Sequence, residues 1–169
     1  MIDSESLQLA NIHIRPIRQS DNEDLAKIIR NTLSEFGAAN PGTVFFDPTT
    51  DALFELFQTE KSTYFVADDN GKILGGGGIF PTEGLPEGTC ELVKMYLLPE
   101  ARGLGLGRTL IEKCLETARE KGFQQVYLET LDELHLALKI YAKFGFEYLK
   151  APLGQTKHFG CGLWMLKKI

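Results

Sequence analysis

Alternating hydrophobic and polar residues predict strands and amphipathic helices along this chain. In the first part, Ile12, Ile14 and Ile17 mark a strand. Ser20-Asp21-Asn22-Glu23 has the pattern of a capping box, and apolar residues at helical spacing follow it. We therefore expect a helix from about residue 21 to residue 36.

A β-hairpin is the clearest local prediction. Residues 64–67 and 73–74 are apolar segments on either side of Asn70-Gly71, and Asn-Gly favours a tight turn because both residues tolerate positive φ. We expect an antiparallel pair of strands here. Between the first helix and this pair, the sequence predicts a loop over residues 37–48 and a short helix near residues 53–57.

A strand, a helix and a second strand follow in the middle of the chain. Residues 92–98 are almost continuously apolar, interrupted by Lys94, as is typical of a central strand. Apolar residues then recur at helical spacing over residues 106–118, the helix ends at Gly122, and residues 123–130 predict another strand. This order predicts a parallel β-α-β unit.

The last part of the chain predicts one more helix and two strands. Asp132 is a candidate N-cap for a helix that ends at Gly145. Residues 146–149 and 162–166 have the pattern of the last strands. Because the sequence has no internal repeat, low-complexity tract or linker, we expect residues 1–169 to form a single α/β domain.

The composition excludes several classes of protein. With 43% hydrophobic and 24% charged residues, the chain resembles an ordinary globular domain rather than a disordered or fibrous one. The 18 Lys and Arg against 23 Asp and Glu give a net charge of -5, which provides no general attraction for nucleic acid or an anionic membrane. This balance weakly favours a cationic substrate.

The sequence indicates neither a membrane span nor a secretion signal, so we expect a cytoplasmic protein. It has no run of eighteen apolar residues, and the opening MIDSESLQLA has acids and serines where a signal peptide needs basic and then apolar residues.

The cysteines, Cys90, Cys114 and Cys161, are odd in number and far apart. We expect free thiols and no metal site.

The most informative segment of the sequence is a glycine-rich loop between a buried strand and a helix. It contains Arg102, Gly103, Gly105, Gly107 and Arg108. Alternate glycines at this position expose backbone amides at a helix N-terminus, where the helix dipole favours an anion such as a pyrophosphate. The two arginines add positive charge. A tight turn with solvated arginines is the alternative.

Two familiar nucleotide loops do not fit this segment. A Walker loop ends in Gly-Lys-Ser/Thr, whereas this chain has Gly107-Arg108-Thr109. A dinucleotide loop follows the first strand of a parallel sheet, whereas this loop follows the fourth predicted strand, behind an antiparallel meander. Neither ATP nor NAD is therefore the expected ligand.

The segment Arg102-Gly103-Leu104-Gly105-Leu106-Gly107 matches the Arg/Gln-x-x-Gly-x-Gly/Ala signature of the Gcn5-related N-acetyltransferases, a family that this chain resembles. A second match lies within residues 137–146, where a helical tyrosine precedes Gly145-Phe146. The resemblance implies the fold of that family over nearly the whole chain. That fold is a central, mixed but mostly antiparallel sheet of about seven strands, with a parallel β-α-β unit and helices on both faces.

The resemblance also implies acetyl-CoA as the co-substrate. The amides of residues 103–108 would hold the coenzyme pyrophosphate, and the backbone of a splayed fourth strand would contact the pantetheine. The expected coenzyme-binding residues are Tyr96, Leu97, Leu98, Arg102, Gly103, Leu104, Gly105, Leu106, Gly107 and Arg108.

Acetyl transfer to an amine needs a base, donors for the developing oxyanion and an acid. Glu91 lies eleven residues before Arg102, an offset that resembles that of the catalytic glutamate in several family members. We expect it to take the ammonium proton directly or through water, and the alternative is a solvated carboxylate at a strand edge. Glu129 is the reserve base, and a backbone N–H at or near Leu97 is the expected oxyanion donor.

Tyr141 is the candidate acid, because the resemblance places it near the coenzyme sulfur. A phenol with a pKa of about 10 can protonate a thiolate. The alternative is an aromatic residue of the core.

His158 and Cys161 lie three residues apart in a predicted strand and so fall on opposite faces, but His158 could line the acceptor pocket. The glycines at 75–78 could admit a substrate or mark a bulge. Three aromatic residues could wall the acceptor pocket or belong to the core: Phe36, Phe45 and Phe46.

Together these features predict an N-acetyltransferase that moves an acetyl group directly from acetyl-CoA to a primary amine, without a metal or a covalent enzyme intermediate. A small-molecule amine is favoured, and a protein or peptide amine is the alternative acceptor. The alternative from another class is a non-catalytic module that senses acyl-CoA, although a sensor has no chemical need for Glu91 and Tyr141. Sheet edges near the C-terminal strand make a homodimer reasonable.

Overall fold

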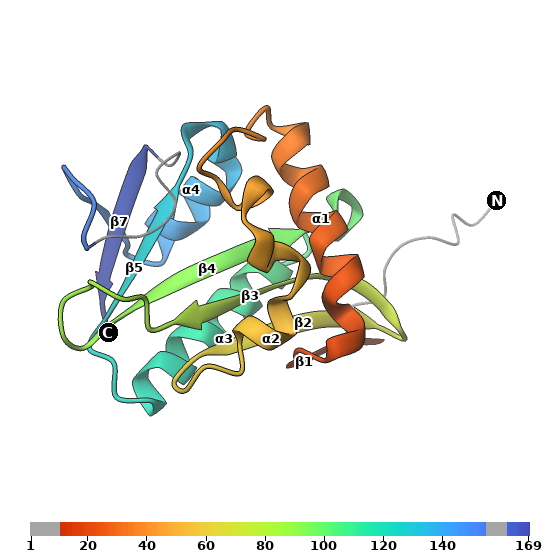
Figure 1. Ribbon diagram of the computed structural model, residues 1–169, viewed down its shortest axis with the longest axis horizontal. Helices are drawn as coiled ribbons and strands as arrows, with labels where there is room; N and C mark the ends of the chain where they lie inside the picture. Colours follow the sequence, from red (N-terminus) through yellow and green to blue (C-terminus); the bar gives the residue numbers. More distant parts are fainter. Residues whose placement is uncertain (1–10, 155–161) are drawn as a thin grey trace.

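A seven-stranded mixed sheet forms the centre of the protein (Figure 1). The computed structural model describes residues 11–154 and 162–169. The strand order is β1-β2-β3-β4-β5-β7-β6, and within the described chain each neighbouring pair is antiparallel except β4 and β5. The strands are β1 (Ile12–Pro16), β2 (Thr63–Asp69), β3 (Lys72–Phe80), β4 (Thr89–Leu97), β5 (Gln125–Thr130), β6 (Glu147–Tyr148) and β7 (Leu163–Lys168). The predicted mixed, mostly antiparallel sheet with its parallel unit is confirmed.

Helices cover both faces of the sheet, as predicted. α1 (Asn22–Glu35) and α2 (Leu53–Leu56) lie on one face, and α3 (Leu106–Glu120) lies on the other. α4 (His135–Lys143) shares a buried apolar cluster with α3. Short 3-10 turns occur at Gln19–Asp21, Val44–Phe46, Pro48–Asp51, Pro99–Ala101 and Asp132–Leu134. Within the described residues, no helix is both long and apolar enough to cross a lipid bilayer.

Each long helix buries the apolar face that its sequence spacing predicts. The buried residues of α1 include Leu25, Ile28, Ile29 and Leu33, which form a cluster with Val66 and Ile73 of the sheet. Those of α3 include Leu110, Ile111, Cys114 and Leu115, which form a second cluster with Cys90, Leu92 and Val126. Cys90 and Cys114 are free thiols, and burial raises the pKa of Cys90 to about 12.

The glycines at 75–78 in β3 are explained by close packing within the sheet. In chain order, Cβ atoms at these four positions would collide with the Tyr96 carbonyl oxygen, the Phe65 carbonyl oxygen, the Met95 side chain and the Thr63 carbonyl oxygen. Since the neighbouring strands already fill this space, the run serves the fold and leaves no room there for a substrate.

The central strand β4 contains a bulge. Its register against β3 shifts so that Lys94 and Met95 together lie opposite Gly77. Lys94 has a φ of 52°, in the left-handed region that a bulky residue seldom adopts. The hydroxyl of Tyr64 donates a hydrogen bond of 2.8 Å to the carbonyl oxygen of Lys94. This bond holds the bulge in place, and a bulge bends the strand that contains it.

β4 and β5 are paired at one end only. Their parallel ladder joins Thr89–Glu91 to Gln125–Tyr127 and stops there. Beyond this point the two strands diverge (Figure 1), while β4 continues its pairing with β3. The edge of β4 that faces β5 therefore carries backbone groups without a partner on β5.

The start of α1 differs from the predicted capping box. A 3-10 turn precedes the helix, and its last residue, Asp21, takes the N-cap position without a side-chain cap. The Asp21 carboxylate accepts hydrogen bonds from Nη1 and Nη2 of Arg15 at 2.8 and 2.9 Å and from the amide of Arg18 at 2.7 Å. The predicted cap of α4 is also wrong, because Asp132 begins a 3-10 turn and Leu134 precedes the helix.

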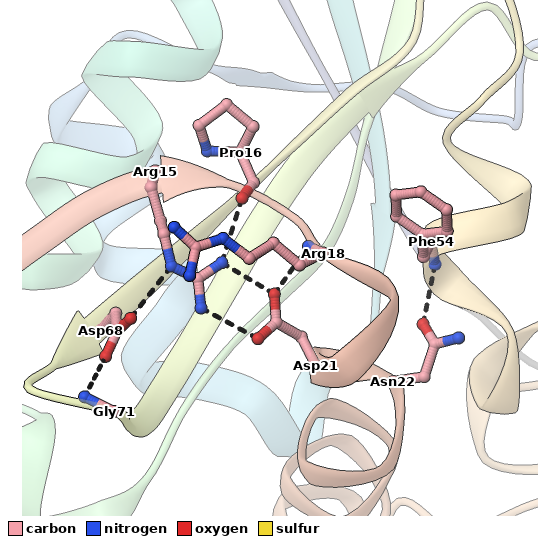
Figure 2. A network of polar contacts seen from close by, with 8 residues as sticks. All are labelled: Arg15, Pro16, Arg18, Asp21, Asn22, Phe54, Asp68 and Gly71. Carbon is pink, nitrogen blue, oxygen red and sulfur yellow. Dashed lines mark hydrogen bonds and ion pairs between the residues drawn. The ribbon is translucent and has the colours of Figure 1, made fainter.

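Arg15 joins three segments that are distant in sequence (Figure 2). Besides Asp21 at the start of α1, its Nε donates to Asp68 of β2 at 2.9 Å. Asp68 in turn accepts the amide hydrogen of Gly71 in the hairpin turn at 2.7 Å. Burial alone would raise the pKa of Asp21, but the hydrogen bonds from Arg15 and Arg18 outweigh it, and the pKa lies below its ordinary value.

We expect Asp21→Asn to lower the free energy of unfolding at pH 7 by about 2–3 kcal/mol, because it removes a buried partner of Arg15. Since the folded pKa of Asp21 is depressed, its contribution is present above the unfolded pKa of about 3.9 and is lost as the pH falls through the folded value. The difference between the two proteins should therefore shrink in acid. Urea unfolding at several pH values measures it.

Glu23→Gln is the matched control, because Glu23 forms an exposed pair with Lys27. It should leave the unfolding free energy nearly unchanged. Equal stability of Asp21→Asn and wild type at pH 7 would contradict the assigned role of the Arg15 network.

Candidate active site

A cavity of about 800 Å³ opens between the diverging halves of β4 and β5. Residues of α1, the 43–44 loop, β4, the glycine loop, β5 and α4 line it. Nine of the predicted site residues are in the lining: Glu91, Tyr96, Leu97, Arg102, Gly103, Gly105, Gly107, Arg108 and Tyr141. The structure thus brings the predicted acid, the predicted base and the glycine loop to one place.

Three predicted coenzyme-binding residues are not in the lining of this cavity. The amide of Leu98 donates to the carbonyl oxygen of Leu74 at 2.8 Å, so it extends the pairing of β3 and β4. Leu106 is buried with Ala67 and Leu74 and anchors the start of α3. For Leu104 and Leu106, only the backbone amides belong to the candidate anion site described next.

The glycine loop forms a cluster of free amides at the start of α3. Gly103 and Gly105 have φ values of 76° and 84°, and Gly105 is the N-cap of the helix. Arg102 donates its amide to Pro99, and Thr109 donates its amide to Gly105. The amides of residues 103–108, which lie between these two residues in the sequence, have no acceptor in the part of the chain that the structure describes. Together with the helix dipole, these amides suit an anionic group.

The two arginines of the loop are engaged by the protein itself. Arg102 forms a double hydrogen bond with Glu35 at the end of α1, at 2.9 Å for both contacts, and its Nε donates to the carbonyl oxygen of Leu97 at 3.2 Å. Its guanidinium also lies 5.3 Å from the ring centroid of Phe36. Arg108 is exposed and pairs with Glu112 at 3.1 Å. Arg102 therefore joins α1 to the loop at the edge of the cavity.

Glu91 lies where β4 and β5 part. It is the last β4 residue paired with β5, opposite Tyr127, and only 3% of its surface is exposed. Its Oε1 accepts a hydrogen bond of 2.7 Å from the hydroxyl of Thr82, which fixes the orientation of the carboxylate. The reading of Glu91 as a solvated strand-edge residue is thus wrong. The reserve candidate, Glu129, also lines the cavity and accepts a hydrogen bond of 2.9 Å from the hydroxyl of Tyr127.

Tyr141 lies in the wall of the cavity and in the core at the same time. Its ring packs edge-on against Phe146 with centroids 5.9 Å apart, and 7% of its surface is exposed. Within the described residues its hydroxyl has no hydrogen-bond partner. Burial raises the pKa of Tyr141, so the phenol stays protonated at neutral pH and can donate.

Lys94 is a cavity residue that the sequence patterns did not single out. Only 3% of its side chain is exposed, and it lines the cavity beside Glu91. The available signal was a lone lysine within an otherwise apolar central strand. Its ion-pair partner is Asp47, whose Oδ2 lies 3.8 Å from the lysine Nζ.

Other predicted pocket residues divide between the cavity and the surface. Phe36 lines the cavity, whereas Phe45 packs against Phe46, which is 59% exposed. His158 and Cys161 lie outside the described residues. Among the residues that are described, no group of three or more His, Cys, Asp or Glu side chains could hold a metal ion.

The charge of the cavity differs from that of the chain. Although the net charge is -5, the lining has five basic residues against two acidic ones. The basic residues are Lys94, Arg102, Arg108, Lys139 and Lys143, and the acidic ones are Glu91 and Glu129. The local excess of positive charge suits an anionic ligand.

The chain is similar to known acetyltransferases in both sequence and structure. The model of the acetyltransferase (GNAT) family matches residues 28–146. The uncharacterized N-acetyltransferase YjgM of Escherichia coli strain K12 is 38% identical over 157 residues, which cover 92% of this chain and 94% of that protein. The crystal structure of a GNAT-family acetyltransferase from Staphylococcus aureus Mu50 matches this structure with a TM-score of 0.82 at 22% sequence identity. The match covers 93% of this chain and 98% of the Staphylococcus chain.

A second solved structure shows the same fold with a coenzyme bound. It is the PaiA N-acetyltransferase from Thermoplasma acidophilum in complex with coenzyme A, with a TM-score of 0.72 at 18% identity. The match covers 94% of this chain and 99% of the other. Because the family model matches residues 28–146 and YjgM is 38% identical over most of the chain, this chain belongs to the acetyltransferase (GNAT) family and is an N-acetyltransferase.

Proposed function

We propose that this protein transfers an acetyl group directly from acetyl-CoA to the primary amine of a small molecule. The observation that carries the proposal is one cavity that holds a buried carboxylate, a protonated phenol and a cluster of free amides. The cavity volume of about 800 Å³ is within the range of small-molecule sites, about 300–1,000 Å³.

The glycine loop is the proposed site of the coenzyme pyrophosphate. The free amides of residues 103–108 support this, since they point to an anion at the N-terminus of a fifteen-residue helix. The pantetheine would follow the edge of β4 that diverges from β5, near Tyr96 and Leu97. The complex of the Thermoplasma protein with coenzyme A adds support for a coenzyme site in this fold.

The transfer requires proton movements at the acceptor nitrogen and at the leaving sulfur, and each atom has a candidate residue. Glu91 takes a proton from the acceptor ammonium, directly or through water, so that the neutral nitrogen can attack the acetyl carbonyl carbon. The carbonyl oxygen becomes an oxyanion, for which a backbone N–H at or near Leu97 is the proposed donor. The carbon–sulfur bond then breaks, and Tyr141 gives its proton to the leaving thiolate. The nitrogen, which is positively charged after its attack, loses a second proton as the amide forms, and this proton restores the Tyr141 phenol.

A thiol-release assay with acetyl-CoA tests the proposal. Amines, polyamines, amino acids and peptides serve as acceptors, and calorimetry measures coenzyme binding separately. Release with a small amine supports the proposal, and release with peptides alone would instead favour a protein acceptor. Tight coenzyme binding without release for any acceptor would favour an acyl-CoA sensor.

We expect Gly107→Val to weaken acetyl-CoA binding by about tenfold or more, because forcing extra methyl groups into an occupied site costs about 1–3 kcal/mol. Gly107 is the better position for this test, since Gly105 has a positive φ that would strain any substitute. Gly107→Ala is the matched control, because its Cβ would make only ordinary contacts, at 3.7 Å to Leu97 and 3.9 Å to Ile140. Calorimetry that finds wild-type affinity in a folded valine variant would contradict the proposed site.

Glu91→Gln should lower kcat at neutral pH by about 10²- to 10⁴-fold while coenzyme affinity changes little, as is usual for loss of a general base. The glutamine keeps an oxygen that can accept the hydrogen bond of Thr82, so the fold should survive. Glu129→Gln is the matched control and should have a smaller effect. If the two variants behaved in the opposite way in thiol-release kinetics, Glu129 would be the base.

Tyr141→Phe should lower kcat by about 10²-fold when carbon–sulfur cleavage limits the rate. Stability should change little, since the hydroxyl has no partner among the described residues. An acetyl donor with a more acidic thiol should partly rescue the variant, because its thiolate needs less help to leave. Tyr148→Phe, at an exposed site, is the control. An unchanged single-turnover rate in Tyr141→Phe would remove the assignment.

A further inference from the structure

The cavity contains a buried cation that the acetyl transfer described above does not use. The Nζ of Lys94 is inaccessible to solvent and has no hydrogen-bond partner within the described chain. The nearest anion is Asp47, and the distance of 3.8 Å to its Oδ2 is longer than a hydrogen bond. An ammonium group has three hydrogen-bond donors, so a buried one without acceptors leaves its binding capacity unused.

The backbone holds Lys94 in this position. Its carbonyl oxygen accepts the hydrogen bond from the buried hydroxyl of Tyr64, and Met95 fills the space opposite Gly77. The residue adopts a left-handed conformation that is unfavourable for a long side chain. Rotation of the strand to expose the ammonium group would break this packing. The lysine is thus fixed in the wall of the cavity.

Asp47 balances the charge of Lys94 only in part. Its Oδ1 accepts hydrogen bonds from the amide of Thr49 at 2.9 Å and from the hydroxyl of the same residue at 2.8 Å, which caps the turn at Pro48–Asp51. Burial lowers the pKa of Lys94, and the carboxylates of Asp47 and Glu91 oppose this effect. A further carboxylate beside Nζ would stabilise the charged ammonium group.

Two threonine hydroxyls in the lining already donate their hydrogen bonds within the protein. The hydroxyl of Thr32 donates to the carbonyl oxygen of Ile28 at 2.7 Å, and that of Thr43 donates to the carbonyl oxygen of Asn40 at 2.7 Å. Both threonines line the cavity, but their protons are already used within the protein. Lys94 thus has hydrogen-bond donors available that these two threonines lack.

We propose that Lys94 binds the carboxylate of the acceptor, and that the acceptor is a free amino acid. The inference rests on the proposed function and specifies its substrate class. The amino group of the acceptor would lie toward Glu91 and its carboxylate toward Lys94, three positions along β4. Apolar side chains of the lining, including Leu33, Val44 and Leu131, would contact the aliphatic part of the acceptor.

The test compares matched acceptors in the thiol-release assay with acetyl-CoA and the full-length protein. Each amino acid is measured beside its carboxamide and beside the amine that lacks the carboxylate. We expect kcat/KM for the wild-type protein to favour at least one amino acid over both analogues by about 10- to 100-fold, as for a charge-assisted hydrogen bond. Peptides with the same first residue separate a free amino acid from a chain terminus.

Lys94→Met should abolish this preference, mainly through KM, while the amine without a carboxylate reacts as before. Asp47→Asn should change KM for the amino acid and leave KM for the amine without a carboxylate unchanged, because it removes the carboxylate that would share Nζ with the acceptor. An asparagine oxygen can still accept the capping hydrogen bond from Thr49. Lys27→Met, at an exposed position of α1, is the control and should change nothing.

The outcomes separate the inference from the proposed function. Thiol release from many amines without preference for a carboxylate would overturn the inference and leave the proposed function standing. Failure to release thiol with any acceptor would overturn both. If Lys94→Met lowered kcat/KM equally for the amino acid and its analogues, Lys94 would be structural and the inference wrong. Should Lys94→Met not fold, the Asp47→Asn result decides alone, and an unchanged KM would count against the inference.

Discussion

The divergence of β4 from β5 is the constraint on which the site depends. Their ladder ends at Glu91, and three residues later the bulge at Lys94 bends β4. Parallel strands that stayed paired would leave no space at this level of the sheet, and the cavity would close. Because they separate, the backbone edge of β4 becomes accessible between α1 and α4, and a buried carboxylate lies at the point of separation.

Glycine packing in β3 makes this geometry possible. Side chains at residues 75–78 would collide with the neighbouring strands, and one at Gly77 would occupy the space that the Met95 side chain of the bulge fills. The run therefore supports the site indirectly, through the bend in β4, rather than by contact with a substrate. At the glycine loop, Arg102 binds Glu35 of α1 and so joins this helix to the loop, whereas the amides of residues 103–108 have no acceptor within the described residues.

Charge is distributed unevenly in this protein, and the distribution matters more than the total. An acidic chain forms a cavity whose lining is mainly basic. The acidic residues concentrate elsewhere, for example in the Arg15 network, where Asp21 and Asp68 tie β1, α1 and the hairpin together. Net charge thus says little about a substrate, because a ligand interacts with the groups within a few ångströms of it.

By itself, the sequence determined the elements and the family. Periodicity located the helices and strands to within a few residues, and the glycine loop together with the tyrosine before Gly145 pointed to an acetyltransferase, since these signals are local and short in range. It did not determine the cap of α1, where Asp21 prefers Arg15 to a helix amide, nor the exposure of Glu91. Only the tertiary structure decided that Lys94 is buried beside Asp47 and has no hydrogen-bond partner among the described residues, because its position depends on a bulge whose register is set by the packing of β3 against β4.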